Sequence, residues 1–135
     1  MDWKLQVVIV PVADVDRAKE FYADKLGFTL DVDHRAGDHF RVVQVTPPGS
    51  ACSIVFGQGV GGGEPGSVKG CQFVVKDIDV AARQLTEAGV AHSGVQHFVD
   101  GVMTPGPDPD GADFNSFVFF EDPDGNAWAV QYSSK

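Results

Sequence analysis

The first half of the chain alternates between apolar and polar stretches that predict one strand, one helix and three further strands. Leu5 to Val12 is rich in Val and Ile, which is typical of a buried strand. Asp14 or Asp16 then caps a helix that Gly27 ends. One face of this helix is apolar, through Val15, Ala18, Phe21, Tyr22 and Leu26. The three later strands are predicted at residues 28–33, 39–46 and 50–56.

The second half repeats this order of elements. Gly70 to Lys76 predicts a strand, and Asp77 opens a helix that reaches Ala88. A shift of 63 positions (77 − 14) superposes the two helix openings, which indicates a duplicated module. A strand is predicted at residues 92–98, a polar loop at 100–113, and a closing hairpin at 114–120 and 126–132 around Asp122-Pro123-Asp124-Gly125.

The two modules predict an α+β fold in a single domain over residues 1–135. We expect module one at about residues 4–57, a flexible glycine-rich connector at 58–67, and module two at about 68–133. Each module has too few elements to cover both faces of its own sheet. We therefore expect two βαβββ modules that curve into an open, eight-stranded, barrel-like sheet around a shared cleft, with the helices outside.

Charge and cysteine content narrow the classes of partner and the compartment. The formal net charge is −9 and the sequence has no basic cluster, which argues against nucleic acid and anionic membrane surfaces as partners. Cys52 and Cys71 form no C-x-x-C pair and are interpreted as reduced thiols. No apolar run approaches the roughly 20 residues of a membrane span, and the first strand begins too early for a signal peptide. We expect a cytoplasmic protein.

Three motifs resemble the vicinal oxygen chelate superfamily, which includes glyoxalases, bleomycin-resistance proteins and ring-cleaving dioxygenases. The opening motif is Pro11-Val12-Ala13-Asp14-Val15-Asp16-Arg17-Ala18, followed by Phe21-Tyr22 and Leu26-Gly27-Phe28. Phe73-Val74-Val75-Lys76-Asp77-Ile78-Asp79 is similar to the opening of the second module, and Asp122-Pro123-Asp124-Gly125-Asn126-x-Trp128 to the closing hairpin. The resemblance covers about residues 4–133 and implies paired βαβββ modules. These motifs are structural and do not identify a reaction.

The resemblance also implies where metal-dependent relatives hold a divalent metal, on four strands inside the cleft. Counted from the matching aspartates, three of these positions in this sequence are Val7, Gly70 and Ala129. The fourth lies on the fourth strand, where we place Ser53. Val, Gly and Ala offer no ligand atom in their side chains. We therefore predict no cofactor and no metal bound in the family's manner.

Side chains alternate between the two faces of a strand, so residues two positions away from these sites face the same cleft. Together they predict a small-molecule pocket with apolar walls and a few polar groups. The predicted ligand-binding residues are Val7, Ile9, Arg41, Ser53, Gln72, Ala129 and Gln131. Arg41 shares a strand face with His39, and would reach a ligand anion unless that face is simply exposed. Gln72 and Gln131 would either bind the ligand or satisfy each other in a filled core.

Three functional hypotheses follow. The first is a bleomycin-resistance-like protein that binds a small apolar or aromatic molecule without metal. The second is a metal-dependent lyase or isomerase of the lactoylglutathione-lyase type, or a dioxygenase-type enzyme, with shifted ligands such as Gln72, Gln131 and a histidine. The third is a cofactor-free enzyme with His97, which precedes the long loop, as its weak general-base candidate. The resemblance further implies a homodimer.

Overall fold

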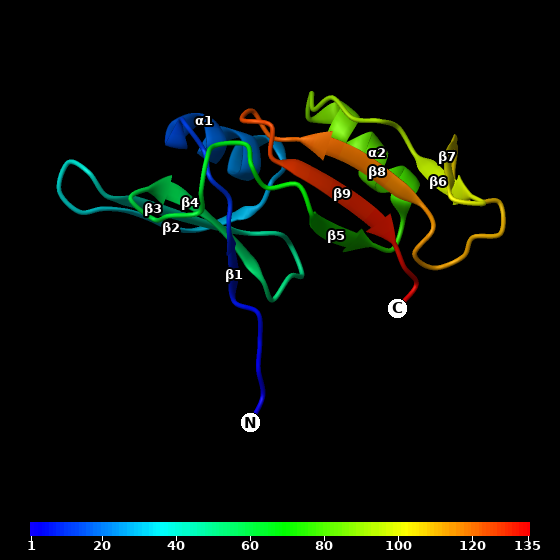
Figure 1. Cartoon of the computed structure of the whole chain (residues 1–135), viewed down its shortest axis with the longest axis horizontal. Coiled ribbons are helices and arrows are strands. Elements are labelled where there is room, and N and C mark those ends of the chain that lie inside the picture. The colour runs from blue at the N-terminus through cyan, green and yellow to red at the C-terminus, as the bar shows by residue number, and fades with distance from the viewer. The chain divides into compact units, whose positions relative to one another are not determined.

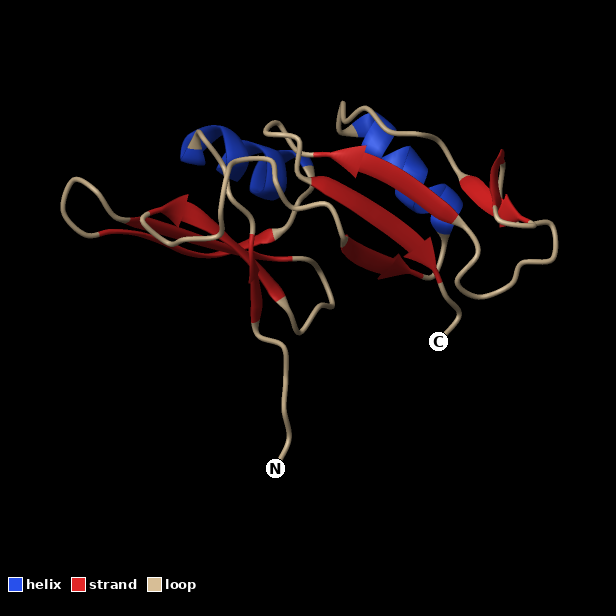
Figure 2. Cartoon of the chain, in the orientation of Figure 1, coloured by secondary structure: helices blue, strands red, loops and turns tan.

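The computed structural model describes residues 1–135 and divides them into two compact units. Unit 1 comprises Met1–Val68 together with Asp122–Asn126, and unit 2 comprises Lys69–Glu121 and Ala127–Lys135. Strands predominate in both units, and each has one helical segment (Figures 1 and 2). None of the helices has the length and apolar character that crossing a membrane requires.

Unit 1 contains a four-stranded sheet and a helical segment. The sheet order is β1-β4-β3-β2, with β1 parallel to β4 and the other neighbours antiparallel. The elements are β1 (Val7–Ile9), α1 (Val15–Lys19), η1 (Glu20–Lys25), β2 (Thr29–Arg35), β3 (Arg41–Thr46) and β4 (Ser53–Gln58). Asp14 caps α1 by accepting a hydrogen bond from the backbone N–H of Arg17, as the sequence predicts.

The helical segment packs against one face of the unit 1 sheet. Tyr22 is fully buried, and its ring centroid lies 5.5 Å from that of Phe56 on β4. Phe56 pairs with Val43 on β3, so these side chains share the helix-facing side. The segment begins and ends as predicted but changes at Glu20 from an α-helix to a π-helix. The N–H of Leu26 donates to the carbonyl of Phe21, five residues earlier, and Phe21 and Tyr22 are both buried.

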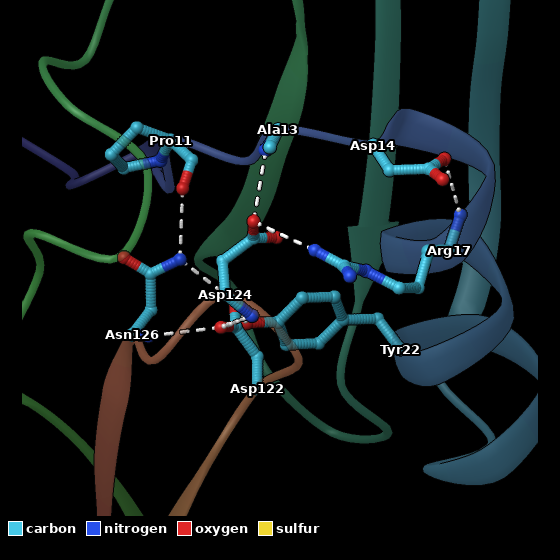
Figure 3. Close-up of polar contacts among 8 residues, drawn as sticks. All are labelled: Pro11, Ala13, Asp14, Arg17, Tyr22, Asp122, Asp124 and Asn126. Carbon is cyan, nitrogen blue, oxygen red and sulfur yellow. Dashed lines mark hydrogen bonds and ion pairs between the residues drawn. The ribbon is translucent and has the colours of Figure 1, made fainter.

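The turn at Asp122–Asn126 belongs to unit 1 by its contacts (Figure 3). The Tyr22 hydroxyl donates to Asp122 Oδ2 at 2.7 Å, inside the unit. Asn126 donates from Nδ2 to the Pro11 carbonyl at 2.9 Å and to Asp122 Oδ2 at 2.8 Å. Asp124 Oδ1 accepts from the Ala13 N–H and from Arg17. The closing-hairpin motif of the sequence is therefore a set of hydrogen bonds that fixes the start of the helical segment.

Unit 2 contains a five-stranded sheet and one helix. The sheet order is β5-β9-β8-β6-β7, with β5 parallel to β9. The elements are β5 (Cys71–Val75), α2 (Ile78–Glu87), β6 (Gln96–Val99), β7 (Val102–Pro105), β8 (Phe117–Glu121) and β9 (Ala127–Tyr132). Asp77 caps α2 as Asp14 caps α1. In each unit the first strand is parallel to the last, which confirms the predicted α+β class and its repeated module.

Two strand predictions in unit 2 were wrong. The loop predicted at residues 100–113 contains β7, which forms a hairpin with β6, so the two open sheets hold nine strands and not eight. The strand predicted at residues 92–98 begins only at Gln96, and His92 makes an isolated bridge with Phe120. The core of unit 2 lies on the face of the sheet that carries Trp128. This side chain is buried and stacks on Phe73 with ring centroids 4.6 Å apart.

Candidate functional site

In unit 1, the face of the sheet away from the helix carries three of the predicted ligand-binding residues. Ser53 on β4 pairs directly with Val7 on β1, and Ile9 pairs with Val55. Ser53 exposes only 8% of its surface, and Ile9 exposes 37%. The side chains of Val7, Ile9 and Ser53 therefore share one face, and of these three side chains only Ser53 is polar.

In unit 2, the predicted residues form two adjacent rows across the sheet. Gln72 on β5 pairs with Ala129 on β9, and Ala129 pairs with Phe119 on β8. The next row contains Gln131, which pairs with Phe117. Gln131 donates from Nε2 to the carbonyl of Phe114 at 3.2 Å. Gln72 and Gln131 thus share a face, as predicted, but Gln131 bonds to the backbone and not to Gln72.

The same face of unit 2 carries an aromatic cluster that the sequence analysis did not identify. The rings of Phe117 and Phe119 stack with centroids 5.8 Å apart and an interplanar angle of 9°. Phe98 on β6 meets Phe117 edge-on, at 5.6 Å and 79°, and exposes 44% of its surface. We call Phe98, Phe117 and Phe119 the aromatic platform. The alternation Phe117-Val118-Phe119 in a predicted strand was the signal that two rings would share one face.

Arg41 lies on the other side of its sheet from Ser53. It alternates with Val43 and Val45, whose side chains are buried on the helix-facing side. Its guanidinium binds Asp33 through Nε at 3.0 Å and Nη2 at 2.9 Å, and Asp16 through Nη1 at 2.7 Å. These hydrogen bonds and charges hold the pKa of Asp33 and of Asp16 below the usual aspartate range and raise the pKa of Arg41.

A cavity of about 470 Å³ lies beside Arg41 in unit 1. Its charged and amide side chains are those of Asp14, Asp16, Arg35, Arg41 and Gln58. Two carboxylates balance two guanidiniums, so the lining has no net charge and no preference for an anion follows from it. The anion-binding role predicted for Arg41 stays a prediction, because the structure gives this residue two protein carboxylates as partners.

His97 is buried, exposing 6% of its surface. Its Nδ1 lies 2.7 Å from the carbonyl oxygen of Gly106. A carbonyl oxygen only accepts, so Nδ1 carries the proton and the bond fixes the loop after β7 to β6. Because side chains alternate along β6, His97 lies on the opposite face from Phe98. The structure therefore does not bring His97 to the aromatic platform, and its role as a general base stays a prediction.

The positions at which relatives bind a metal do not fit one in this chain. Val7, Gly70 and Ala129 have no donor atom, and Ser53 would offer only a neutral hydroxyl. No three His, Cys, Asp or Glu side chains lie close enough together to hold a metal ion. The shifted ligand set predicted as an alternative needs a histidine beside Gln72 and Gln131, and His97 lies on the other face of the unit 2 sheet.

Comparison with known proteins places this geometry in a family. Residues 4–130 match the model of the Glyoxalase/Bleomycin resistance protein/Dioxygenase superfamily. The fold is similar to that of TnmS3, an antibiotic binding protein from Streptomyces sp. CB03234, with 32% identity, 98% of each chain covered and a TM-score of 0.77.

Two further relatives span nearly the whole chain. A superfamily member from Sphaerobacter thermophilus is 28% identical, with a TM-score of 0.73 and 98% of each chain covered. The uncharacterised protein YetH of Bacillus subtilis is 25% identical over 129 residues, which are 95% of this chain and 97% of that protein.

Proposed function

The chain belongs to the Glyoxalase/Bleomycin resistance protein/Dioxygenase superfamily, and from this premise we propose that it binds a small aromatic or apolar molecule without a metal. The observation that carries the proposal is the aromatic platform of unit 2. Phe98 and Phe119 are only partly covered, although large apolar side chains on a sheet face are normally buried. Stacked and edge-on rings of this kind favour a planar aromatic ligand.

The neighbours of the aromatic platform suit such a ligand. Ala129, beside Phe119, has no side chain beyond its methyl group, so a ring lying over this residue meets no bulky group. The Gln72 amide is exposed and has no hydrogen-bond partner in the chain, so it is free to bind a polar substituent. Apolar walls with a few hydrogen-bonding groups are typical of small-molecule sites.

The chemistry of the donor set supports binding without metal. A divalent ion needs anionic or imidazole ligands, whereas the family positions offer Val7, Gly70, Ala129 and a serine hydroxyl. The antibiotic binding activity named for TnmS3, at 32% identity over nearly the whole chain, supports a ligand of the size and character of a natural product. We infer sequestration of such a molecule and not its chemical conversion.

Two further proposals concern the oligomeric state of the protein and its cellular compartment. We propose a homodimer, because Val99 and Val102, which pair across the β6–β7 hairpin, leave exposed apolar surface that a second copy would cover. Light scattering after gel filtration should then give twice the chain mass of 14.4 kDa. We propose a cytoplasmic location, because the sequence has only two cysteines and no C-x-x-C pair, too few for a disulfide framework.

The ligand proposal is tested by calorimetric titration of the EDTA-treated protein with 2-naphthol, a two-ring aromatic probe. We expect saturable binding, and we expect Phe119→Ala to weaken it about five-fold, the equivalent of about 1 kcal/mol for one aromatic contact. Phe40→Ala is the matched control, because Phe40 is a partly exposed ring in the turn before β3 of unit 1. Absence of saturable binding, or equal weakening by both substitutions, would overturn the proposal.

A further inference from the structure

Three polar side chains in unit 1 form a chain of hydrogen bonds across β2, β3 and β4. Thr46 Oγ1 on β3 donates to Asp31 Oδ2 on β2. Thr46 Oγ1 also lies 2.7 Å from Ser53 Oγ on β4. Continuing the β3–β4 pairing by one residue places Thr46 directly opposite Ser53, so the contact follows from the register of the sheet.

The number of hydroxyl hydrogens determines which group donates in each of these hydrogen bonds. A hydroxyl carries one hydrogen, and an ionised carboxylate only accepts. The hydrogen of Thr46 must therefore point to Asp31. The bond between Thr46 and Ser53 then needs the hydrogen of Ser53, because Thr46 has no second one. Ser53 Oγ is left with lone pairs and no hydrogen for any further partner.

The backbone holds Asp31 in place as the last acceptor in this series of hydrogen bonds. The β2–β3 pairing slips between Leu30 and Val32, so Asp31 is the extra residue of a bulge in β2. Gln44 Nε2 also points toward Asp31 Oδ2, at 3.4 Å. A hydroxyl that donates toward a negative charge becomes a stronger acceptor, so the carboxylate strengthens the acceptor character of Ser53 Oγ.

We propose that Ser53 accepts a hydrogen bond from a hydroxyl or N–H group of a molecule bound on this face of unit 1. Ser53 lies opposite Val7 on the face predicted to meet the ligand. A ligand carbonyl or ether oxygen at this position would meet lone pairs, and both acceptors would lose their hydrogen bonds to water. The inference rests on the proposed function and adds a rule of selectivity: unit 1 selects aromatic molecules with a donor group over their acceptor-only analogues.

The test compares 2-naphthol with 2-methoxynaphthalene, which has the same rings but no donor on its oxygen. We measure the ratio of the two dissociation constants in each variant, so that the different hydrophobicity of the probes cancels. Ser53→Ala should lower the preference for naphthol about five- to ten-fold, because it removes the acceptor. Asp31→Asn should lower it as well, because an amide can donate to Thr46 and release the hydrogen of Ser53 toward the ligand.

Ser50→Ala is the matched control, since the Ser50 hydroxyl donates to the Cys52 carbonyl and takes no part in the chain of hydrogen bonds. An unchanged ratio in Ser53→Ala, or an equal change in Ser50→Ala, would overturn the inference. If neither probe binds, the proposed aromatic ligand is wrong. The direction of the hydrogen bond between Ser53 and Thr46 is then tested separately, by NMR of the Ser53 hydroxyl proton. A nuclear Overhauser effect from that proton to the Thr46 side chain supports acceptor-only Ser53, and its absence overturns it.

Discussion

Arg41 binds two carboxylates from different elements of unit 1 and exposes only 7% of its side chain. Arg41→Met removes the cation and leaves Asp33 without its main partner. We expect the free energy of unfolding at pH 7, measured by urea denaturation, to fall by about 3 kcal/mol, as for a buried pair that loses one member. Asp16→Asn is the control: this side chain is 77% exposed, so water screens its bond to Arg41 and its loss should lower the free energy of unfolding far less. Equal losses would contradict a buried ion pair.

Asp33 makes unit 1 sensitive to acid. Hydrogen bonds from Arg41 and Lys19 hold its pKa below the ordinary value of 3.8 in the folded state. The unfolded chain therefore takes up the proton first, and stability that is present above pH 3.8 is lost as the pH falls below it. We expect the thermal midpoint to fall from pH 5 to pH 2.5, and to fall less in Asp33→Asn. A variant that loses as much as the wild type would show that other carboxylates are responsible.

Single residues differ in how far the sequence determines their position. Ser53 was placed on the predicted fourth strand because the resemblance puts the fourth metal position there, and the structure pairs it with Val7. Arg41 was expected near the ligand because alternation alone does not say which face of β3 packs against the helix. The contact of Asp31 with Thr46 depends on a bulge that shifts the β2–β3 register, and the local sequence pattern does not predict that shift.

At the scale of elements, the turn between β8 and β9 is tied to η1 by Tyr22. Tyr22→Phe removes only the hydroxyl that donates to Asp122 Oδ2 and leaves that buried carboxylate one partner short. We expect the free energy of unfolding to fall by about 1–3 kcal/mol in urea denaturation. Tyr132→Phe is the matched control, because the Tyr132 hydroxyl has no hydrogen bond in the chain. A comparable loss in both variants would mean that the bond to Asp122 contributes nothing specific.

Most elements could be predicted because their ends carry local signals. Asp14 and Asp77 cap both helices, and Gly27 follows the first helical segment with a φ of 73°. The change to a π-helix at Glu20 has no such signal in the local sequence. β7 did have one: Asp100-Gly101 lies between Val99 and Val102, and its φ angles of 48° and 78° are those of a tight hairpin turn. The prolines after it favoured a loop.

For the whole molecule, the duplication explains why the fold was more predictable than the site. In each unit the first strand pairs in parallel with the last strand, β1 with β4 and β5 with β9. The sequence indicates this repeat through an aspartate cap and a strand–helix–strand order that it displays twice. The ligand-facing residues do not repeat: the unit 1 face presents Ser53 beside Val7 and the polar Thr46, whereas unit 2 presents phenylalanines. Function therefore depends on side chains that the repeat does not constrain, and the single-domain organisation stays a prediction.

The family's metal positions make a prediction for the whole protein. Val7, Gly70 and Ala129 cannot coordinate an ion, so we expect well under one equivalent of metal after exposure to Ni²⁺, Zn²⁺, Mn²⁺ or Fe²⁺ and gel filtration, measured by elemental mass spectrometry. EDTA should leave the thermal midpoint unchanged, because only a ligand that binds the folded state stabilises it. One retained equivalent that Gln72→Ala abolishes would establish the shifted ligand set and favour a metal-dependent enzyme. One retained equivalent that persists in Gln72→Ala but is lost in His34→Ala would instead be surface binding at an exposed histidine of β2.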